Sequence, residues 1–248
     1  FLGTGTSCGV PTLGCSCKVC RSTNPHDSRL RCAALVETDT TRLLIDCGPD
    51  IRQQLMPLPF RRIDGVLLTH MHYDHVGGID DLRPYCRFGT IPLYGDCKTL
   101  RHVRQSMPYC FPHGLMQRIE KSLPWLKLKL YPGVPSLSLN PIHAHRPFSV
   151  GDIEVLPINV LHGKLPILGF RIGRNFAYIT DMKSMSEDEL HYLKGVRTLV
   201  VNALRFEKPH HSHQLVADAV AFANKVGAEQ TWLIHFNHDI GLETEAQA

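Results

Sequence analysis

The sequence contains no apolar run that approaches the about 20 residues needed to cross a bilayer, so it predicts no membrane-spanning helix. It also has no internal repeat, no low-complexity tail, no signal-peptide pattern and no run of basic residues that could form a nucleic-acid-binding face. The formal net charge of +4 is compatible with an anionic ligand but does not require one. These absences argue against a membrane protein, a repeat protein and any nucleic-acid partner other than small fragments.

Cysteine, in contrast, is abundant: nine residues, an odd number, accompany 15 histidines in 248 positions. Three of the cysteines lie within six positions, a spacing typical of metal binding rather than of a disulfide framework. Metal-binding thiols are typical of a reducing compartment, so we expect a cytoplasmic protein. With 43% apolar and 20% charged residues, the chain can form one large hydrophobic core.

Short runs rich in β-branched and aromatic residues alternate with stretches of helical periodicity, which predicts an α/β fold. The predicted strands are 41–46, 63–68, 91–94, 153–161, 168–172, 176–180, 198–201 and 231–234. The predicted helices are 80–86, 98–106, 186–193 and 212–226, the last capped by Ser212 and ended by Gly227. The stretch 107–150 holds seven of the 17 prolines, so we expect an insertion or lid within a single domain that spans residues 1–248.

The stretch THMHYDHVGG, residues 69–78, follows a predicted buried strand. Residues two apart on an extended chain face the same side, so His70 and His72 can share one metal ion. The following turn carries Asp74 and His75 toward a second position. Neutral imidazoles with a carboxylate suit zinc, manganese or iron better than calcium or magnesium, and two neighbouring ions are typical of two-metal hydrolases.

Three more potential ligands follow predicted strands elsewhere in the chain. His162, Asp181 and His235 each come after an apolar run, where the loops of an α/β fold carry functional residues. A lone histidine there is more often an ordinary polar residue, but three suitable residues at three strand ends favour one shared site. Asp46, after another predicted strand, could accept a hydrogen bond from a ligand imidazole or could belong to an ordinary turn.

The loop GCSCKVC, residues 14–20, places Cys15, Cys17 and Cys20 where they can surround one ion. A closed tetrahedral zinc site needs a fourth ligand, and His238 is the best candidate, with His26 next. Unpaired thiols in a loop are the alternative interpretation. The other six cysteines are expected to be small core residues or unreactive thiols.

This pattern of histidines, aspartates and strand ends resembles the metallo-β-lactamase superfamily over most of the chain, apart from the stretch 107–150. The resemblance implies a four-layer αββα sandwich with two mixed β-sheets. It also implies how the ligands divide: one metal is held by His70, His72 and His162, the other by Asp74, His75 and His235, and Asp181 bridges the two. A histidine rather than a glutamate at position 72 favours a hydrolase over the oxygen-reducing di-iron branch.

The opening G-T-G-T-S-x-G-V-P, the C-x-C-x-x-C loop and the H-x-x-H near the end are similar to the phosphodiesterase family of bacterial phosphonate degradation, which hydrolyses cyclic ribosyl phosphodiesters. That family has a catalytic histidine that is not a metal ligand, and His213 in PHHSH matches it best. At the start of the helix predicted at 212–226, this imidazole could contact a phosphoryl oxygen or protonate a leaving alkoxide. Asp74 and His213 are therefore the expected catalytic residues. Asn202 departs from the family, which has an aspartate there.

Together these features predict a metal-dependent phosphodiesterase for small-molecule substrates, with two divalent ions (manganese or zinc) at the catalytic site and one structural zinc at the cysteines. A hydroxide that bridges the two ions would attack phosphorus. Three alternatives stay open: a ribonuclease that resembles the tRNA 3′-processing enzyme, a lactone, thioester or amide hydrolase on the same ions, and a zinc-storing or zinc-sensing protein without catalysis. The stretch 107–150 could also serve as a homodimer interface.

Overall fold

Two mixed β-sheets form the framework of the computed structural model, which describes residues 1–111 and 133–246. In the first sheet, β1 is antiparallel to β2, and β2, β3, β4 and β5 follow one another in parallel. Its strands are β1 (Ala34–Glu37), β2 (Arg42–Ile45), β3 (Gly65–Leu67), β4 (Ile91–Gly95) and β5 (Leu137–Pro141). Strand β1 is short, and the sequence pattern did not predict it.

The second sheet has the strand order β11-β10-β9-β8-β7-β6. Strands β9, β10 and β11 are parallel, whereas β6, β7, β8 and β9 pair antiparallel. The strands are β6 (Phe148–Val150), β7 (Ile153–His162), β8 (Leu165–Ile172), β9 (Phe176–Ile179), β10 (Thr198–Asn202) and β11 (Gln230–Ile234). Because β7 is separated from β9 by one antiparallel strand, β7, β9, β10 and β11 all end on the same side of the sheet.

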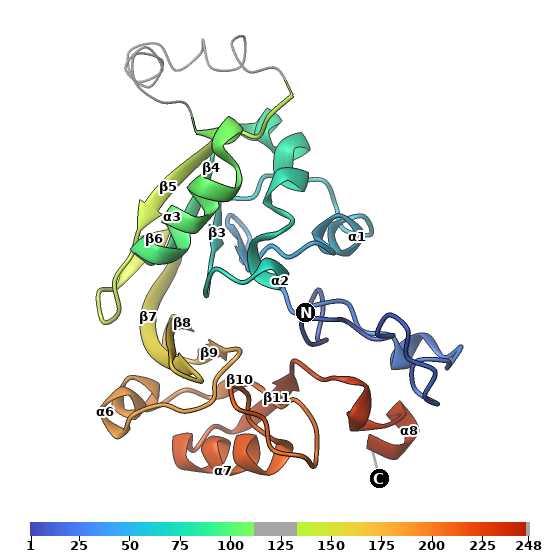
Figure 1. Cartoon of the computed structure of the whole chain (residues 1–248). Helices are drawn as coiled ribbons and strands as arrows, with labels where there is room; N and C mark the ends of the chain where they lie inside the picture. Colours follow the sequence, from blue (N-terminus) through green and yellow to red (C-terminus); the bar gives the residue numbers. More distant parts are fainter. Residues whose placement is uncertain (112–132, 247–248) are drawn as a thin grey trace.

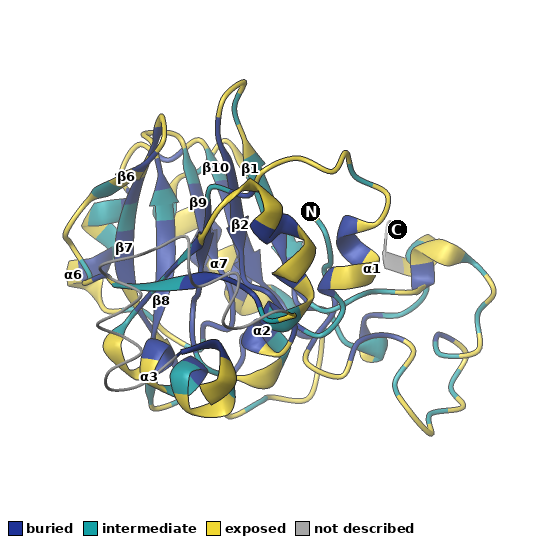
Figure 2. Ribbon diagram, turned by 90° about the horizontal axis from the view of Figure 1, so that it is seen from above, coloured by how far each residue is buried: buried dark blue, intermediate teal, exposed yellow. Residues whose placement is uncertain are grey.

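Three layers of buried hydrophobic side chains hold the molecule together: one between the two sheets and one between each sheet and its helices. Successive side chains of a strand point to opposite faces of the sheet, so one strand contributes to two of these layers. In β2, Leu43 and Ile45 face the second sheet, Leu44 faces the helices on the other side, and all three are fully buried. In β10, Val200 faces the first sheet, whereas Leu199 and Val201 face outward. Each fully buried side chain of this size contributes about 1.5–3 kcal/mol relative to an exposed one. Figure 2 shows the strands as the buried centre of the molecule, with exposed helical faces outside.

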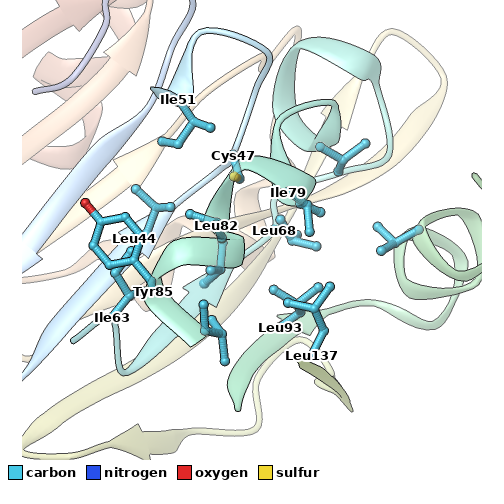
Figure 3. Close-up of a cluster of buried hydrophobic side chains, with 14 of the residues drawn as sticks. Leu44, Cys47, Ile51, Ile63, Leu68, Ile79, Leu82, Tyr85, Leu93 and Leu137 are labelled. Atoms are coloured by element: carbon cyan, nitrogen blue, oxygen red, sulfur yellow. The ribbon is translucent and has the colours of Figure 1, made fainter. Parts of the chain in front are cut away.

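Helices cover the outer face of each sheet, which confirms the predicted αββα sandwich. Helices α1 (Ile51–Leu55), α2 (Tyr73–Val76), η2 (Ile79–Phe88) and α3 (Cys97–Ser106) pack over the first sheet, where Figure 3 shows the core that they share. Helices α6 (Glu187–Leu190), η5 (His191–Leu193) and α7 (Val216–Val226) pack over the second sheet. The short helices η1 (Pro25–Asp27), η3 (Pro108–Cys110), η6 (His238–Ile240) and α8 (Glu243–Ala246) lie in the connections and at the C-terminus.

Two sequence predictions need correction. The helix predicted at 212–226 begins at Val216, with Leu215 as its N-cap and the Asp218 carboxylate accepting a hydrogen bond from the Leu215 amide, so Ser212 does not cap it. The stretch 107–150 is not wholly an insertion, because β5 and β6 lie within it and pair in the two sheets. Residues 112–132 of that stretch lie outside the described residues, so the predicted lid stays a prediction there.

The N-terminal loop and the C-terminal segment lie side by side, as the blue and red ends in Figure 1 show. The Asp27 carboxylate accepts a hydrogen bond from the Glu243 amide (2.7 Å), and Lys18 pairs with Glu245. Within residues 1–111 and 133–246, no helix is both long enough and apolar enough to cross a membrane.

Candidate metal centre

The histidine stretch follows β3 and turns at once into the four-residue helix α2. His72 is the N-cap of α2, and the His72 carbonyl accepts a hydrogen bond from the His75 amide (2.9 Å), so the turn projects His70 and His72 to one place and Asp74 and His75 to another. Two glycines allow the neighbouring loop to pack against this turn. A Cβ atom on Gly78 would lie 2.0 Å from the Gly48 carbonyl oxygen, and a Cβ atom on Gly48 would lie 2.0 Å from the Asp74 carbonyl oxygen.

The structure brings all seven predicted catalytic-site ligands together in overlapping groups. In each group the potential ligand atoms lie within 4.8 Å of one another. The groups are His70, His72 and His162; Asp74, His75, Asp181 and His235; and His162, Asp181 and His213. Residues from both sheets contribute, because β2 and β3 in one sheet and β7, β9 and β11 in the other end at this edge.

Asp181 lies at the middle of these groups. Its Oδ2 is 3.2 Å from Nε2 of His75, and its Oδ1 is 3.1 Å from Nε2 of His235. The Thr180 hydroxyl donates a hydrogen bond to Oδ2 (2.7 Å). Both oxygens thus face imidazoles of the same predicted metal position. Asp181 also belongs to the group that contains His162 of the other position, and this shared place is what a bridging ligand requires.

Several buried nitrogens of the site make no hydrogen bond in the described chain: Nε2 of His75, both ring nitrogens of His235 and Nδ1 of His213. The two Nε2 atoms lie 3.2 and 3.1 Å from Asp181 oxygens, so they form close polar contacts without the geometry of a hydrogen bond. Buried polar atoms without partners are costly, and a cation that accepts their lone pairs would remove this cost. A set of imidazoles and carboxylates is also the donor chemistry that divalent transition metals prefer. The residues therefore fit a divalent-metal site.

Outer hydrogen bonds orient the ligand rings so that the second nitrogen of each ring faces the centre. The Nδ1 atom of His75 donates to Asp46 (2.7 Å), and Nδ1 of His70 contacts the Thr69 hydroxyl (3.0 Å), which in turn donates to Asp46. The Nδ1 atom of His162 lies 3.0 Å from the Ser212 carbonyl oxygen. This is the arrangement that fixes the tautomer of a metal-binding histidine. The predicted acceptor role of Asp46 is confirmed.

The backbone is strained at the ends of three strands that reach the site. Asp46, Asp181 and His235 follow β2, β9 and β11, and their φ angles are +60°, +55° and +66°. Non-glycine residues rarely adopt this left-handed region, and they do so mostly where the surrounding structure enforces it. Asn202, at the end of β10, contributes one such constraint. Its side chain accepts from the Met182 amide (2.6 Å) and donates to the Met182 carbonyl (3.0 Å), next to Asp181.

The electrostatics of the site favour ionised carboxylates. Burial raises the pKa of Asp74, but the His75 imidazole outweighs burial and holds the pKa well below its usual range. Burial acts in the same way on Asp181, and the His235 and His75 imidazoles hold its pKa well below the usual range. Burial also lowers the pKa of His70, which keeps that ring neutral. These carboxylates in turn raise the pKa of His75 well above its usual value despite burial, so a divalent ion that binds here would replace a proton on that ring.

His213 is buried beside the ligand groups, but it does not lie at the start of a helix as the sequence analysis expected. It lies three residues before α7, so the predicted position inside a helix N-terminus is wrong. Its Nδ1 is 3.8 Å from Oδ1 of Asp181, and its ring lies 4.7 Å from the ring of His162. Burial, with the neighbouring His235, lowers the pKa of His213 to about 2, so the ring is neutral at physiological pH. The ring of His210 stacks on its outer side (4.9 Å).

The cysteine loop forms a second, separate group at the surface. The Sγ atoms of Cys15 and Cys17 lie 3.3 and 3.2 Å from Nδ1 of His238, and Cys20 completes a set of four ligand atoms within 4.8 Å. Hydrogen bonds from the Cys20 amide and from His238 lower the pKa of Cys17 to about 6, whereas burial raises the pKa of Cys20 to about 11. His26, the second candidate, instead lies 3.8 Å from Glu243.

Sequence reasoning missed two contributors to the candidate site, Thr69 and the Ser212 carbonyl, because neither is a group that signals a metal site. It noted Asn202 only as a departure from the family, and did not predict that this side chain holds Met182 next to Asp181. Thr69 precedes His70 in the histidine stretch, so its position could have drawn attention. The Ser212 and Asn202 contacts depend on chain segments that only the tertiary structure brings close.

A family model described as "Beta-lactamase superfamily domain" matches residues 41–236. The chain is similar to a solved structure described as a new diphosphatase from the PhnP family, with 34% identity and a TM-score of 0.85 over 99% of this chain and 88% of that chain. Both comparisons agree with the two-sheet fold described above.

Two curated proteins are also similar to this chain. The Octanoyltransferase of Porphyromonas gingivalis is 41% identical over 246 residues, which cover 99% of this chain and 47% of that protein. The anti-Pycsar protein Apyc1 of Paenibacillus harenae is 28% identical over 214 residues, which cover 84% of this chain and 83% of that protein. This chain therefore spans about half the length of the first relative and most of the second.

Proposed function

This chain belongs to the metallo-β-lactamase superfamily, as a hydrolase that resembles the PhnP family, and on that premise we propose that it hydrolyses small phosphodiesters at a dinuclear metal site. The observation that carries the proposal is that Asp181 belongs both to the group of Asp74, His75 and His235 and to the group that contains His162. The relative described as a diphosphatase supports phosphorus chemistry in particular.

The residues that would hold the two ions follow from the three groups of ligand atoms. His70, His72 and His162 would bind one ion, Asp74, His75 and His235 the other, and Asp181 both. When bound, a pair of manganese or zinc ions supplies Lewis acidity at phosphorus and makes a water molecule acidic enough to attack at neutral pH. Asp46 and Thr69 keep the ligand rings oriented while charge changes during the reaction.

We assign His213 a role at the leaving oxygen. Its imidazole is buried, borders the ligand groups and has an Nδ1 atom with no hydrogen-bond partner in the described chain. From this position the neutral ring would donate its N–H as a hydrogen bond to the oxygen that leaves phosphorus and stabilise the charge that develops there, an effect typically worth about 10²–10³-fold in kcat. Asp74, whose side chain is 13% exposed, lies where a carboxylate can both hold a metal and accept a proton from the attacking water.

The cysteine group would bind one structural zinc. Four protein ligands leave no open coordination position, so this ion would stabilise the fold and take no part in hydrolysis. It would join the cysteine loop to His238, which is 223 residues from Cys15 and 221 residues from Cys17 in the sequence.

A thioester hydrolase is the second candidate, because one relative is named Octanoyltransferase. That relative is about twice as long as this chain, so its activity could reside in the part that this chain does not match. A planar acyl thioester would also leave His213 without a clear role, since a thiolate leaves without a proton donor. The phosphodiester is therefore the better supported substrate class.

The proposal is tested by metal exchange and a substrate panel. The chelated protein, reloaded with manganese or with zinc, is assayed on bis(p-nitrophenyl) phosphate, p-nitrophenyl phosphate, octanoyl thioesters, lactones and a tRNA precursor. We expect diester hydrolysis that chelation abolishes and metal restores, with poor monoester hydrolysis. Diester activity that survives chelation unchanged contradicts the metal site. Faster hydrolysis of the thioester contradicts the substrate class, and no hydrolysis at all favours a zinc-binding protein without catalysis.

A further inference from the structure

A hollow of about 480 Å³ lies on the outer side of the first sheet, between helix η2 and helix α1 with the segment that follows α1. We call this hollow the α1–η2 groove. None of the potential ligands of the His/Asp cluster lines it, and neither does any residue of the cysteine cluster. The groove therefore belongs to neither metal site.

The groove has an apolar floor and two apolar side chains that project beside it. Leu55 and Tyr85 are buried, and Tyr85 also belongs to the core that Figure 3 shows, so the floor is continuous with the interior. Met56 and Phe60 line the same groove but are 69% and 46% exposed. Prolines in the segment 57–59 cannot continue a helix, so the chain leaves α1 along the surface. Large exposed apolar side chains beside an apolar hollow are typical of an interaction surface.

Aromatic contacts hold Phe60 in place. Its ring packs on the rings of Tyr85 (4.7 Å between centroids) and Phe88 (5.3 Å). The Arg87 guanidinium lies over both Phe60 and Phe88, at 5.9 and 5.7 Å from the ring centroids. A side chain that is ordered before a partner binds loses little conformational entropy on binding.

The charged residues of the groove are balanced in sign. Two arginines and two aspartates line it: Arg52, Arg83, Asp80 and Asp81. Asp80 and Arg83 already bind within the chain, to the Tyr109 hydroxyl (3.1 Å) and to a backbone carbonyl. Arg52 and Asp81 are exposed, and they form no hydrogen bond or ion pair with each other or with any other residue that the structure describes. One cation and one anion are therefore available to a partner.

We propose that the α1–η2 groove is the interface at which two copies of this chain form a symmetric dimer. Across a twofold axis a surface meets itself, so Arg52 of each copy can face Asp81 of the other. A strongly acidic or strongly basic partner would instead place a like charge against Asp81 or Arg52. The balanced charges thus favour a second copy over such a partner.

The shape of the groove supports the same occupant. One surface carries both the projecting Met56 and the hollow, and a twofold contact would place Met56 of each copy in the hollow of the other. The flexible methionine side chain adapts to an irregular hollow. The apolar centre with charges at its rim is also the usual arrangement of a protein–protein interface.

The dimer does not depend on the substrate of the metal centre. Because no potential catalytic-site ligand lines the groove, substitutions in the groove should leave metal content and diester turnover unchanged. These two measurements also report whether each variant is folded.

Sedimentation equilibrium of the full, metal-loaded chain tests the dimer from about 1 to about 100 µM. We expect a reversible monomer–dimer equilibrium. Met56→Lys would place a charge in the hollow of the other copy, and it should raise the Kd of the dimer at least about 100-fold. Val220→Lys, at a residue 47% exposed on α7, is the matched control and should not change the Kd. A chain that stays monomeric throughout this range overturns the proposal, as does a dimer that Met56→Lys leaves intact.

Charge reversal tests the twofold pairing. In a symmetric dimer each reversal creates two like-charge contacts, so Arg52→Glu alone and Asp81→Arg alone should each raise the Kd at least about tenfold. An equimolar mixture of the two variants should form the dimer again, because both contacts between unlike copies then join opposite charges. Lys194→Glu, an exposed reversal outside the groove, should have no effect. Both side chains are exposed, so these variants should fold even if Met56→Lys does not. Reversals without effect, or a mixture that does not restore the dimer, overturn the proposal.

Discussion

The two clusters of potential ligands are built in opposite ways, although His235 and His238 are only three residues apart. The His/Asp cluster lies at the ends of strands from both sheets, and Asp181 and His235 are at most 2% exposed. The cysteine cluster lies half-buried at the surface, in one loop and one residue of the C-terminal segment. A site that catalyses needs a rigid, water-poor surrounding with an open face, whereas a site that only joins two segments needs nothing beyond its four ligands.

The strained φ angles illustrate the same contrast. Asp46, Asp181 and His235 are held in the left-handed region by the sheets and by contacts such as that of Asn202 with Met182. None of the four residues of the cysteine cluster has a positive φ. Precise positioning is therefore a property of the His/Asp cluster, and the substitutions below should separate the two clusters.

The largest effect is expected from Asp181→Ala. Loss of the shared carboxylate should lower metal content and reduce kcat by on the order of 10²–10³ or more, because several kcal/mol of metal-derived stabilisation disappear. The measurements are metal analysis and phosphodiesterase rate, with Asp188→Ala at an exposed carboxylate as control. A variant that kept both ions and full rate would show that Asp181 does not bridge, and the contrast between the clusters would lose its basis.

His213→Ala should separate chemistry from metal binding. We expect kcat to fall by about 10²–10³-fold while the metal content stays unchanged, because a hydrogen-bond donor to the leaving oxygen is lost but no ligand is. A leaving group of low pKa, such as p-nitrophenolate, should be less affected than an alkoxide. His191→Ala, at an exposed histidine, is the control. His213 lies in one group of potential ligand atoms with His162 and Asp181. Loss of an ion in His213→Ala would therefore identify this residue as a metal ligand.

Asp46→Asn should have a smaller effect on the same cluster. Asparagine tolerates the left-handed backbone at this position, but its amide nitrogen cannot accept the hydrogen bond from Nδ1 of His75. Metal affinity should fall about 10–100-fold, so turnover should recover as the metal concentration in the assay rises. Asp39→Asn, in an exposed turn, should leave the metal titration unchanged. A loss of turnover that added metal cannot restore would contradict an orienting role.

The smallest effect on turnover is expected from Cys17→Ser. The variant should lose one zinc and about 5–10 °C of melting temperature, since the ion joins distant segments, while the folded protein keeps most of its kcat. His238→Ala should do the same, and His26→Ala should leave the zinc count unchanged. Collapse of turnover in folded Cys17→Ser with its other ions in place would make the cysteine cluster part of the mechanism.

The sequence alone was sufficient to predict the general fold and to select the candidate ligands that the structure brings together. The local conformation of THMHYDHVGG follows from its own sequence. A strand that leads directly into a short helix directs His70 and His72 to one place and Asp74 and His75 to another. The same local logic located His162, Asp181 and His235 just beyond apolar strands. Strand patterns also predicted most of both sheets, because burial on alternate faces leaves a period that the sequence preserves.

Only the tertiary structure decided the contacts between segments far apart in the chain. Helix α7 begins at Val216, where the Asp218 carboxylate accepts a hydrogen bond from the Leu215 amide. Ser212 and His213 therefore lie before the helix rather than at its cap and first turn. The contact of Nδ1 of His162 with the Ser212 carbonyl requires segments 50 residues apart to meet, and no local pattern records such a pairing. The spacing of side chains along a strand or turn is set by covalent geometry, so it can be predicted from the sequence. The packing of segments that are distant in the chain depends on the free energy of the whole fold, so it cannot be predicted from a local pattern.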